Sequence, residues 1–388
     1  ARLNLVLREN LTGMMVIRAF ATEKKEEQRF GEVNAELTGI MLFVSRIMAL
    51  MMPLITLIMN GISILIVWVG AKEIAQSQIQ IGDMMAFMQY SMQIFFSFMM
   101  MSMMFIIIPR ASISADRIHQ VLTTGTSVVD PPSPAVFPDK LGGVVRFDNV
   151  SFRYPGSNED VLHRIDFTAR PGKVTAVVGT TGAGKTTLVS LVPRFYDVTE
   201  GSVSIDGVDV RSVKQKALRD LIGFVPQKAS LFSGTVESNL RYARDEAGSE
   251  DLDRALEIAQ AKEFVRALPG GISAPVSQGG MNFSGGQRQR LTIARALMKK
   301  GPVFIFDDSF SALDFTTDKK LRAALTEKLA DSTVILVTQR VATIKGADQI
   351  IVLDEGKMVG KGRHAELMET CEVYRDIALS QLSAEELV

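Results

Sequence analysis

The chain has 388 residues, 47% hydrophobic and 22% charged, and its 43 basic and 43 acidic side chains leave no net charge. This apolar fraction can build a large core, so the composition excludes a disordered chain. The balanced charge produces no overall basic field, so we expect no nucleic-acid partner. The single Cys371 cannot form an internal disulfide, which indicates a reducing compartment for the domain around it.

Two long segments without charged residues lie in the first third of the chain. Ile47–Ala71 and Met84–Pro109 contain no Asp, Glu, Lys or Arg. A helix of either length, at 1.5 Å per residue, crosses the roughly 30 Å hydrocarbon core of a bilayer. Buried core helices rarely avoid charge for so long, so we predict two membrane spans, at about 47–71 and 84–109.

The charges that flank these spans predict their orientation. Residues 72–83, between the spans, carry one basic and two acidic side chains. Arg110 and Arg117 follow the second span, and seven Lys or Arg residues precede the first. Basic residues concentrate on the cytoplasmic side, so both ends are predicted to be cytoplasmic. We expect an integral protein of the plasma (inner) membrane that contacts membrane lipid.

Polar side chains interrupt the second span, where contact with lipid would be costly. They are Gln89, Tyr90, Gln93, Ser97 and Ser102. They either line a substrate cavity or pack between helices, and the sequence leaves both roles open.

The sequence pattern divides the chain into three parts. Leu3–Phe43 is amphipathic and charged in its middle, which predicts a long cytoplasmic helix. Thr123–Lys140 contains four prolines, which exclude a helix and indicate a linker. We therefore predict the C-terminal part of a transmembrane region over 1–122, a linker over 123–141 and a soluble domain over 142–388.

The soluble domain alternates short apolar strands with helices, which predicts an α/β fold with a mostly parallel sheet covered on both faces. The expected strands are Val144–Phe147, Val174–Val178, Val203–Ile205, Val303–Phe306, Val334–Val337 and Ile350–Leu353. The expected helices are Thr186–Leu191, Leu252–Leu268, Gly285–Lys300 and Asp318–Ala330.

A glycine-rich loop directly follows the strand Val174–Val178 and precedes a helix. Its pattern Gly179-x4-Gly184-Lys185-Thr186 is that of a phosphate-binding loop, in which backbone N–H groups and a helix N-terminus converge on phosphate oxygens. Lys185 would bridge the β- and γ-phosphates, and Thr186 would ligate Mg²⁺. The candidate binding residues are Gly179, Thr180, Gly182, Ala183, Gly184, Lys185, Thr186 and Thr187.

A carboxylate at the end of a buried strand supplies the second half of a phosphate site. Four apolar residues, Val303–Phe306, precede Asp307, which can hold a metal directly or through water. Together with the glycine-rich loop, this residue predicts a site for ATP and Mg²⁺.

Five motifs follow one another in the domain. They are Gly179–Thr187 (Walker A), Val225–Gln227, Phe283–Arg290 (the signature), Phe304–Asp308 and Ser311–Asp314. Their order closely resembles the nucleotide-binding domain of ATP-binding cassette (ABC) transporters, over nearly all of 142–388. The resemblance implies an exporter half-transporter in which four membrane helices precede Ala1 and Ala19–Phe30 includes a coupling helix that touches a nucleotide-binding domain.

The resemblance also assigns roles to single residues. Tyr154 resembles the aromatic residue that stacks on adenine. Without the resemblance, an aromatic residue at such a position more often belongs to a β-strand and binds no base. Gln227 resembles the residue that contacts Mg²⁺ or the attacking water. By the same resemblance, the signature residues Ser284, Gly285, Gly286 and Gln287 would face the nucleotide bound by a second domain. Asp314 would lie at the interface between the two domains.

Two positions depart from the family pattern. Where hydrolysing members carry a catalytic Glu after the Walker B Asp, this chain has Asp308. Where exporters usually carry His, it has Gln339, which can donate through its amide but never titrates. Both changes concern the γ-phosphate, so we predict a site that binds ATP but hydrolyses it poorly.

The intact signature of this chain would serve the nucleotide held by a partner. We therefore expect a subunit of a heterodimeric exporter that moves a small molecule, lipid or peptide. The alternatives are a slow homodimeric exporter and an ATP-gated channel or regulatory subunit. A soluble cassette ATPase that acts on DNA or ribosomes would share the motifs, but the two predicted spans argue against it.

Overall fold

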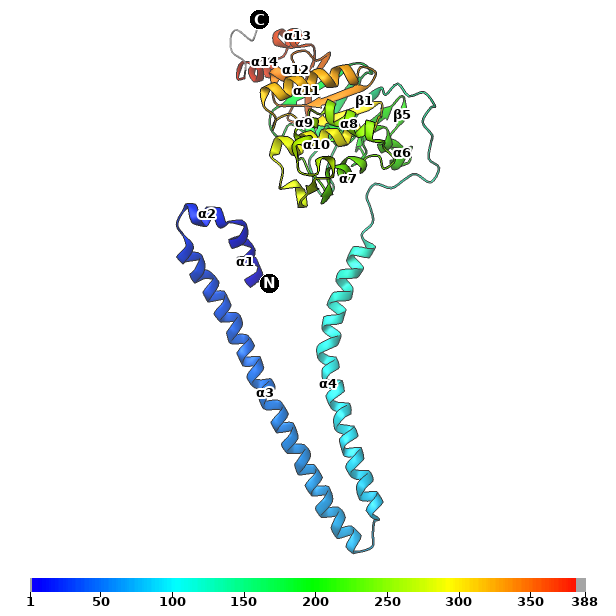
Figure 1. Cartoon of the computed structure of the whole chain (residues 1–388). Helices are drawn as coiled ribbons and strands as arrows, with labels where there is room; N and C mark the ends of the chain where they lie inside the picture. The colour runs from blue at the N-terminus through cyan, green and yellow to red at the C-terminus, as the bar shows by residue number, and fades with distance from the viewer. Residues whose placement is uncertain (1, 382–388) are drawn as a thin grey trace. The chain divides into compact units, whose positions relative to one another are not determined.

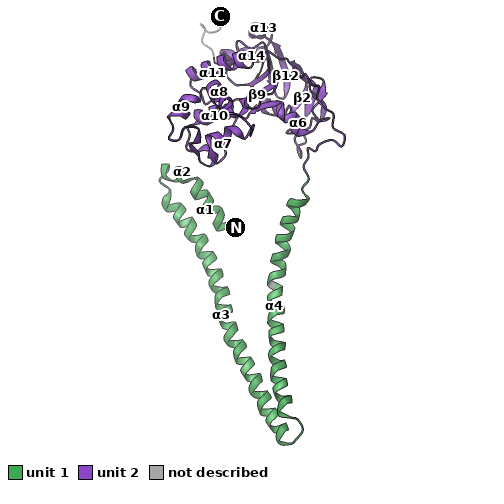
Figure 2. Cartoon of the chain, turned by 45° about the vertical axis from the view of Figure 1, so that its right-hand side comes forward, with its two compact units in different colours: residues 1–125 green, residues 126–388 purple. Residues whose placement is uncertain are grey.

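The structure is a computed structural model that describes residues 2–381, and it divides into two compact units, residues 1–125 and 126–388 (Figure 2). The first unit is built of helices, and the strands belong to the second (Figure 1). The predicted fold class is confirmed in its architecture, since a helical first unit is followed by an α/β unit with a large sheet.

The first unit contains four helices. They are α1 (Arg2–Thr12), α2 (Met14–Ala19), α3 (Glu23–Ala75) and α4 (Ile81–Thr123). The prediction of one continuous helix over Leu3–Phe43 is wrong, because the chain turns at Gly13 and again around Ala21, whose φ is +50°. The short helix α2 ends where the segment Ala19–Phe30 begins, and that segment itself contains a turn and the start of α3.

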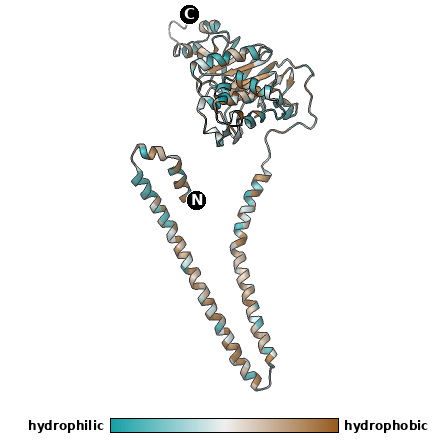
Figure 3. Cartoon of the chain, viewed as in Figure 1, coloured by the Kyte–Doolittle hydropathy of each residue, from teal (hydrophilic) through white to brown (hydrophobic). Residues whose placement is uncertain are grey.

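Both predicted spans lie inside single helices, 47–71 within α3 and 84–109 within α4. The two helices are long and apolar enough to cross a membrane (Figure 3). Many of their large apolar side chains are exposed. Water would disfavour so much exposed apolar surface, whereas lipid would solvate it. The loop between the helices is shorter than expected, since only residues 76–80 separate them.

Serine hydroxyls in the second span form hydrogen bonds within their own helix. The hydroxyls of Ser97 and Ser102 donate to the carbonyl groups of Gln93 and Phe98, at 2.9 Å and 3.0 Å. These bonds lower the cost of placing a hydroxyl in an apolar medium. The cavity and helix-packing roles of the polar residues in the second span therefore both remain predictions.

The second unit is built on a ten-stranded sheet in the order β5-β4-β1-β2-β12-β11-β3-β10-β9-β6. Its strands are β1 (Val145–Phe152), β2 (Leu162–Ala169), β3 (Val174–Gly179), β4 (Glu200–Ile205), β5 (Val208–Asp209), β6 (Ile222–Val225), β9 (Val303–Asp307), β10 (Thr333–Val337), β11 (Gln349–Asp354) and β12 (Lys357–Gly362). A separate pair is formed by β7 (Gly234–Thr235) and β8 (Pro275–Val276).

The sheet is mixed. Strands β6, β9, β10, β3 and β11 run parallel, as the alternation of strands and helices predicts. Strands β1, β2, β4 and β5 pair antiparallel and extend the sheet on one side. The parallel section carries the phosphate loop and Asp307, so it positions the candidate site.

Alternation along the strands creates a core on each face of the sheet. In β9, Val303 and Ile305 join the core that includes Leu188 of α5, whereas Phe304 and Phe306 join the other core. This two-residue period is what buried strands impose. The helices of the unit are α5 (Lys185–Ser190), α6 (Gln215–Asp220), α7 (Val236–Arg241), α8 (Ser249–Ile258), α9 (Lys262–Ala267), α10 (Gly285–Leu297), α11 (Phe315–Lys328), α12 (Val341–Ile344), α13 (His364–Thr370) and α14 (Glu372–Leu379).

Two predicted helices end elsewhere than expected. The predicted helix Leu252–Leu268 is broken into α8 and α9, because Gln260 adopts a left-handed φ of +54° between them. The helix that follows the signature ends at Leu297 and does not reach Lys300, whose φ is +49°. Positive φ is incompatible with an α-helix, and at both positions it is adopted by a residue other than glycine.

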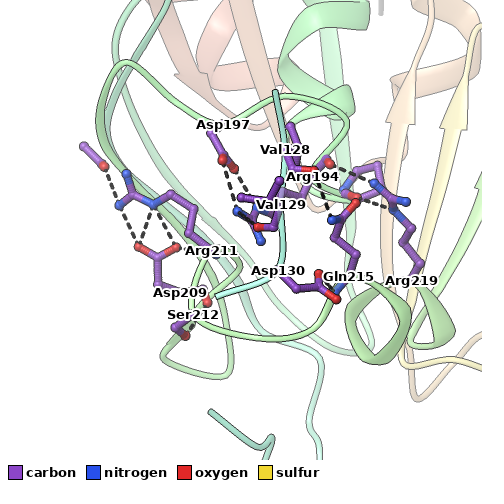
Figure 4. A network of polar contacts seen from close by, with 12 residues as sticks. Val128, Val129, Asp130, Arg194, Asp197, Asp209, Arg211, Ser212, Gln215 and Arg219 are labelled. Atoms are coloured by element: carbon purple, nitrogen blue, oxygen red, sulfur yellow. Dashed lines mark hydrogen bonds and ion pairs between the residues drawn. The ribbon is translucent and has the colours of Figure 1, made fainter. Parts of the chain in front are cut away.

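The segment predicted as a linker is bonded to the nucleotide-binding domain over residues 128–135 (Figure 4). The Asp130 carboxylate accepts from the backbone N–H of Gln215 at 2.9 Å. The buried Arg194 donates to the Val129 carbonyl at 3.0 Å and to both oxygens of Asp197. These contacts join the linker to the segment that follows α5 and to the start of α6.

Candidate functional site

The predicted site residues meet at the carboxyl ends of three parallel strands. In the register of the sheet, Val337 of β10 pairs with Val177 of β3 on one side and with Asp307 of β9 on the other. Gly179 ends β3, and Asp308 and Gln339 follow β9 and β10, so these three residues lie along one edge. This edge is where open α/β sheets bind ligands.

The glycine-rich loop has the backbone that a phosphate cradle needs. Gly182 and Gly184 have φ of +87° and +92°, and α5 begins at Lys185. A Cβ on Gly184 would lie 2.8 Å from the side chain of Leu162, and the positive φ itself would strain any residue other than glycine. The first N–H groups of a helix have no intrahelical partner, which leaves those of α5 available to phosphate oxygens.

Lys185 is held inside this loop. Its ammonium group donates to the carbonyl oxygens of Gly179 and Thr180, at 2.8 Å and 2.7 Å. Burial lowers the pKa of Lys185, while Asp308 and Asp307 oppose this shift through their charges. The charged nitrogen therefore lies between the loop and the acidic strand end, where it can pair with phosphate oxygens.

Thr186 and Asp307 lie next to each other, as a magnesium site requires. The Thr186 hydroxyl donates to the Asp307 carboxylate at 3.1 Å. Asp307 is only 2% exposed, and burial raises its pKa. Within residues 2–381, no group of three or more His, Cys, Asp or Glu side chains could hold a metal. The oxygen donors present fit Mg²⁺, which is often bound by one or two protein ligands together with phosphates.

Asp308 follows Asp307 in a left-handed conformation, with φ of +44°. Asp adopts this region more readily than most residues. The Gln227 amide lies 3.5 Å from the Asp308 carboxylate, and the Asp308 N–H donates to the Val337 carbonyl at 2.9 Å. Burial raises the pKa of Asp308. The structure thus brings Asp308 close to Gln227, the residue predicted to contact Mg²⁺ or the attacking water.

Tyr154 is fixed against the helix that follows the phosphate loop. Its hydroxyl lies 2.9 Å from the hydroxyl of Thr187, within hydrogen-bond distance. Phe152 and Tyr196 meet its ring edge-on, with centroids 4.9 Å and 5.2 Å away. The ring is half-buried and rigidly placed beside the loop, so it suits a flat base. Stacking on adenine remains a prediction.

The signature residues form the N-terminus of α10. The Ser284 hydroxyl accepts from the Gln287 N–H at 3.3 Å, and the Gln287 side chain accepts from the Ser284 N–H at 3.0 Å. This capping box leaves Gly285 exposed at the start of a 13-residue helix, where the dipole favours an anion.

Asp314 lies in the segment that packs against the signature helix. A Cβ on Gly286 would approach the Ala312 carbonyl to 3.1 Å, so the two segments are in close contact. Asp314 caps α11 by accepting from the Thr317 N–H at 3.0 Å, and this hydrogen bond lowers its pKa. The signature and Asp314 therefore lie on segments that pack against each other.

Two residues that belong to none of the sequence motifs contact the strand edge. Arg340 donates to the Ser311 carbonyl at 2.9 Å, and it directly follows Gln339. Gln381 donates to the Gln339 carbonyl at 2.7 Å from the end of α14. Adjacency to Gln339 could have drawn attention to Arg340, whereas no local pattern points to Gln381.

Comparison with known proteins agrees with this geometry. Residues 1–98 match the family model of the ABC transporter transmembrane region, and residues 162–311 match that of the ABC transporter. An uncharacterized ABC transporter ATP-binding protein of Mycobacterium tuberculosis is 45% identical over 98% of this chain and 65% of its own length. The chain thus spans just under two thirds of the relatives it matches.

Two further relatives have more specific descriptions. The ATP-dependent lipid A-core flippase of Pseudomonas aeruginosa is 35% identical over 94% of this chain and 60% of its own length. The solved structure of a bacterial Atm1-family ABC exporter with ATP bound is 30% identical, with a TM-score of 0.84 over 97% of this chain and 66% of that one. The chain belongs to the ABC transporter family, its two matched regions being the transmembrane region and the ATP-binding domain of that family.

Proposed function

We propose that this chain is a subunit of an ATP-driven exporter of the plasma (inner) membrane, with its nucleotide-binding domain in the cytoplasm. The family match and the two apolar helices support this activity. The name of the lipid A-core flippase supports a lipid as cargo. A small molecule or a peptide also fits an exporter of this family.

The phosphate loop and its neighbours would bind ATP with Mg²⁺. Lys185 and the N–H groups of the loop would pair with the phosphate oxygens, and Tyr154 would stack on the base. Thr186, Asp307 and Gln227 would hold the metal, which neutralises phosphate charge when it is bound. The Thr186–Asp307 hydrogen bond of 3.1 Å supports this assignment.

The site of this chain would bind ATP better than it hydrolyses it. The observation that carries this proposal is the placement of Asp308 beside Gln227, at the position where the family carries a catalytic Glu. Asp is one methylene shorter, which withdraws the carboxylate by roughly 1–1.5 Å, the length of a carbon–carbon bond. A misplacement of about 1 Å can cost on the order of 10²-fold in rate.

Gln339 would add to this impairment. Its side chain can donate to a γ-phosphate but cannot change its charge near neutral pH. It follows β10 at the same edge as Asp308, and it is exposed. Both departures from the family pattern therefore fall where the terminal phosphate would lie.

The partner would be a second half-transporter that supplies Glu and His at its own site. The exposed helix start at Ser284 and Gly285 suits a phosphate presented by another domain. Hydrolysis at the partner's site would reset the closed state that ATP favours. In such a heterodimer, ATP would be hydrolysed mainly at one of the two sites, that of the partner.

The decisive experiment is a copurification with an ATPase assay. Tagged wild-type chain is compared with the double variant Asp308→Glu plus Gln339→His, and with the exposed control Asp331→Glu. We expect a distinct second polypeptide and at least a tenfold gain in hydrolysis at the double-variant site. Equal rates in all three proteins would refute an impaired site, and copurification of this chain alone would refute the heterodimer.

A second comparison separates the two sites. Replacing Ser284 or Gly285 is expected to abolish ATP hydrolysis by the complex, because the nucleotide bound by the partner would lose its contact with the N-terminus of α10. Asp308→Ala is expected to change turnover only modestly. The reverse ranking would show that catalysis takes place at the site of this chain.

A further inference from the structure

A side chain at the C-terminal end of the described chain clamps the backbone around Gln339. The amide oxygen of Gln381 accepts from the Val341 N–H at 2.9 Å, and its nitrogen donates to the Gln339 carbonyl at 2.7 Å. One primary amide thus pairs with two backbone groups that bracket Arg340. Among side chains, only Asn and Gln offer an amide donor and a carbonyl acceptor for such pairing.

The clamp satisfies a group that would otherwise be costly to bury. Val341 is the first residue of α12 and is fully buried, and the first N–H groups of a helix have no intrahelical acceptor. The preceding N–H, that of Arg340, donates to the Thr338 hydroxyl at 3.1 Å. Gln381 therefore completes the cap of α12 and fixes the turn that carries Gln339.

The same turn is bonded on its other side to the segment that follows Asp308. Arg340 donates to the Ser311 carbonyl at 2.9 Å, and the Ser311 hydroxyl donates to the Asp308 carbonyl at 3.0 Å. A continuous set of hydrogen bonds therefore runs from Gln381 through the Gln339 turn to Asp308. Replacing Gln381 would remove the hydrogen bonds that hold the Gln339 turn on the side opposite Ser311.

The clamp projects from a firmly packed helix. Tyr374 and Ala378 of α14 are fully buried, and α14 packs against β3 and β11. Strand β3 leads directly into Gly179 of the phosphate loop. Through α14, Gln381 thus couples the position of Gln339 to β3, the strand that leads into the phosphate loop.

We propose that Gln381 is a positioning residue that holds Gln339 toward the terminal phosphate, so that the C-terminal helix contributes to the discrimination of ATP from ADP. The proposal rests on the proposed function of the site. Gln381 is not expected to touch the nucleotide, because it acts through the backbone of Gln339. Its contribution should therefore appear only when a γ-phosphate is present.

The test measures labelling of this chain by 8-azido-ATP and 8-azido-ADP in the full membrane complex. Adenine would lie beside Tyr154 of this chain, so label on its gel band reports its own site. Gln381→Glu keeps the shape but removes the donor to Gln339. We expect its apparent affinity for 8-azido-ATP to fall about tenfold, as for one lost hydrogen bond, with 8-azido-ADP unchanged within twofold.

Two further variants make the result specific. Ser380→Ala removes an exposed hydroxyl from the adjacent residue and should behave as wild type. Gln339→Ala should cause the same selective loss, and adding Gln381→Glu to it should cause no further loss, because coupled residues are not additive. An unchanged ratio of the two affinities in Gln381→Glu, or an equal loss for both nucleotides, would overturn the proposal.

The failure of the proposed function would be seen in a different measurement. It would appear as unchanged hydrolysis in Asp308→Glu plus Gln339→His, which leaves Gln381 in place. The ratio of 8-azido-ATP to 8-azido-ADP affinity reports on the clamp alone.

Discussion

The Thr186 hydroxyl donates a hydrogen bond to the Asp307 carboxylate, with 3.1 Å between the two oxygens. Because both side chains would hold Mg²⁺, Thr186→Val should weaken binding of ATP by about tenfold in the presence of Mg²⁺, equivalent to one charge-assisted hydrogen bond. Thr186→Ser keeps the hydroxyl and should bind as wild type. Titration with fluorescent ATP, with and without EDTA, measures the effect. An equal loss of affinity under both conditions would exclude a role in metal binding.

Tyr154 allows the ring and its hydroxyl to be tested separately. Tyr154→Phe removes the contact with Thr187 but keeps the ring, so nucleotide affinity should change little. Tyr154→Ala removes the stacking surface and should cost about 1–3 kcal/mol of binding free energy, the usual range for a base stacked on an aromatic ring. Calorimetric titration with ATP distinguishes the variants. Equal affinity of Tyr154→Ala and Tyr154→Phe would show that the ring only packs against Phe152 and Tyr196.

The parts of the fold that local chemistry determines could be predicted from the sequence. Gly182 and Gly184 stand where the loop needs positive φ, and the buried strand Val303–Asp307 is continuously apolar up to its carboxylate. Strands β2 and β12 could not be predicted in this way. Strand β12 has no buried residue, β2 mixes buried with partly exposed residues, and the place of both strands in the sheet depends on pairing with distant strands.

Contacts between distant segments account for most of what the sequence did not reveal. Gln381 bonds to the backbone of Gln339, and backbone groups carry no residue-specific pattern. In the same way, the prolines of the linker correctly exclude a helix but give no sign that Asp130 bonds to the Gln215 N–H. The break at Gln260 is a third case, since a non-glycine residue adopts positive φ only within its folded surroundings.

Arg194 is expected to hold the linker against the nucleotide-binding domain. Its side chain is 5% exposed and pairs with Asp197 and with the Val129 carbonyl (Figure 4). Arg194→Met should lower the free energy of unfolding by about 1–3 kcal/mol, because it removes the hydrogen bonds from a buried guanidinium group to the Asp197 carboxylate and the Val129 carbonyl. Limited proteolysis should also cleave faster near Val129. Thermal unfolding and a proteolysis time course measure the two effects.

An exposed arginine provides the matched control for this prediction. Arg146 pairs with Asp148 and Asp166, but its side chain is 48% exposed. Arg146→Met should therefore change the stability by less than about 1 kcal/mol and leave the linker protected. If both variants are destabilised equally, or if the linker is cleaved no faster in Arg194→Met, the linker is not held by Arg194.

His364 should make the stability of the nucleotide-binding domain depend on pH. It is 8% exposed, and its Nδ1 lies 2.8 Å from the Tyr374 hydroxyl. Burial, and secondly the charge of Lys345, lower the pKa of His364 from its usual 6.5, while burial raises the pKa of Tyr374 to about 12. The phenol therefore keeps its proton and can donate to the neutral imidazole.

The lowered pKa fixes the direction of the effect. Below pH 6.5 the unfolded chain binds a proton that the folded chain does not, so the free energy of unfolding falls as the pH decreases, by at most about 1.4 kcal/mol per pH unit from this residue. Above pH 7 this contribution is absent. His364→Gln can still bond to Tyr374 but does not titrate, so its unfolding midpoint should decline less between pH 7 and pH 5 than that of wild type. Parallel declines, measured by denaturant unfolding in matched buffers, would show that His364 does not cause the pH dependence.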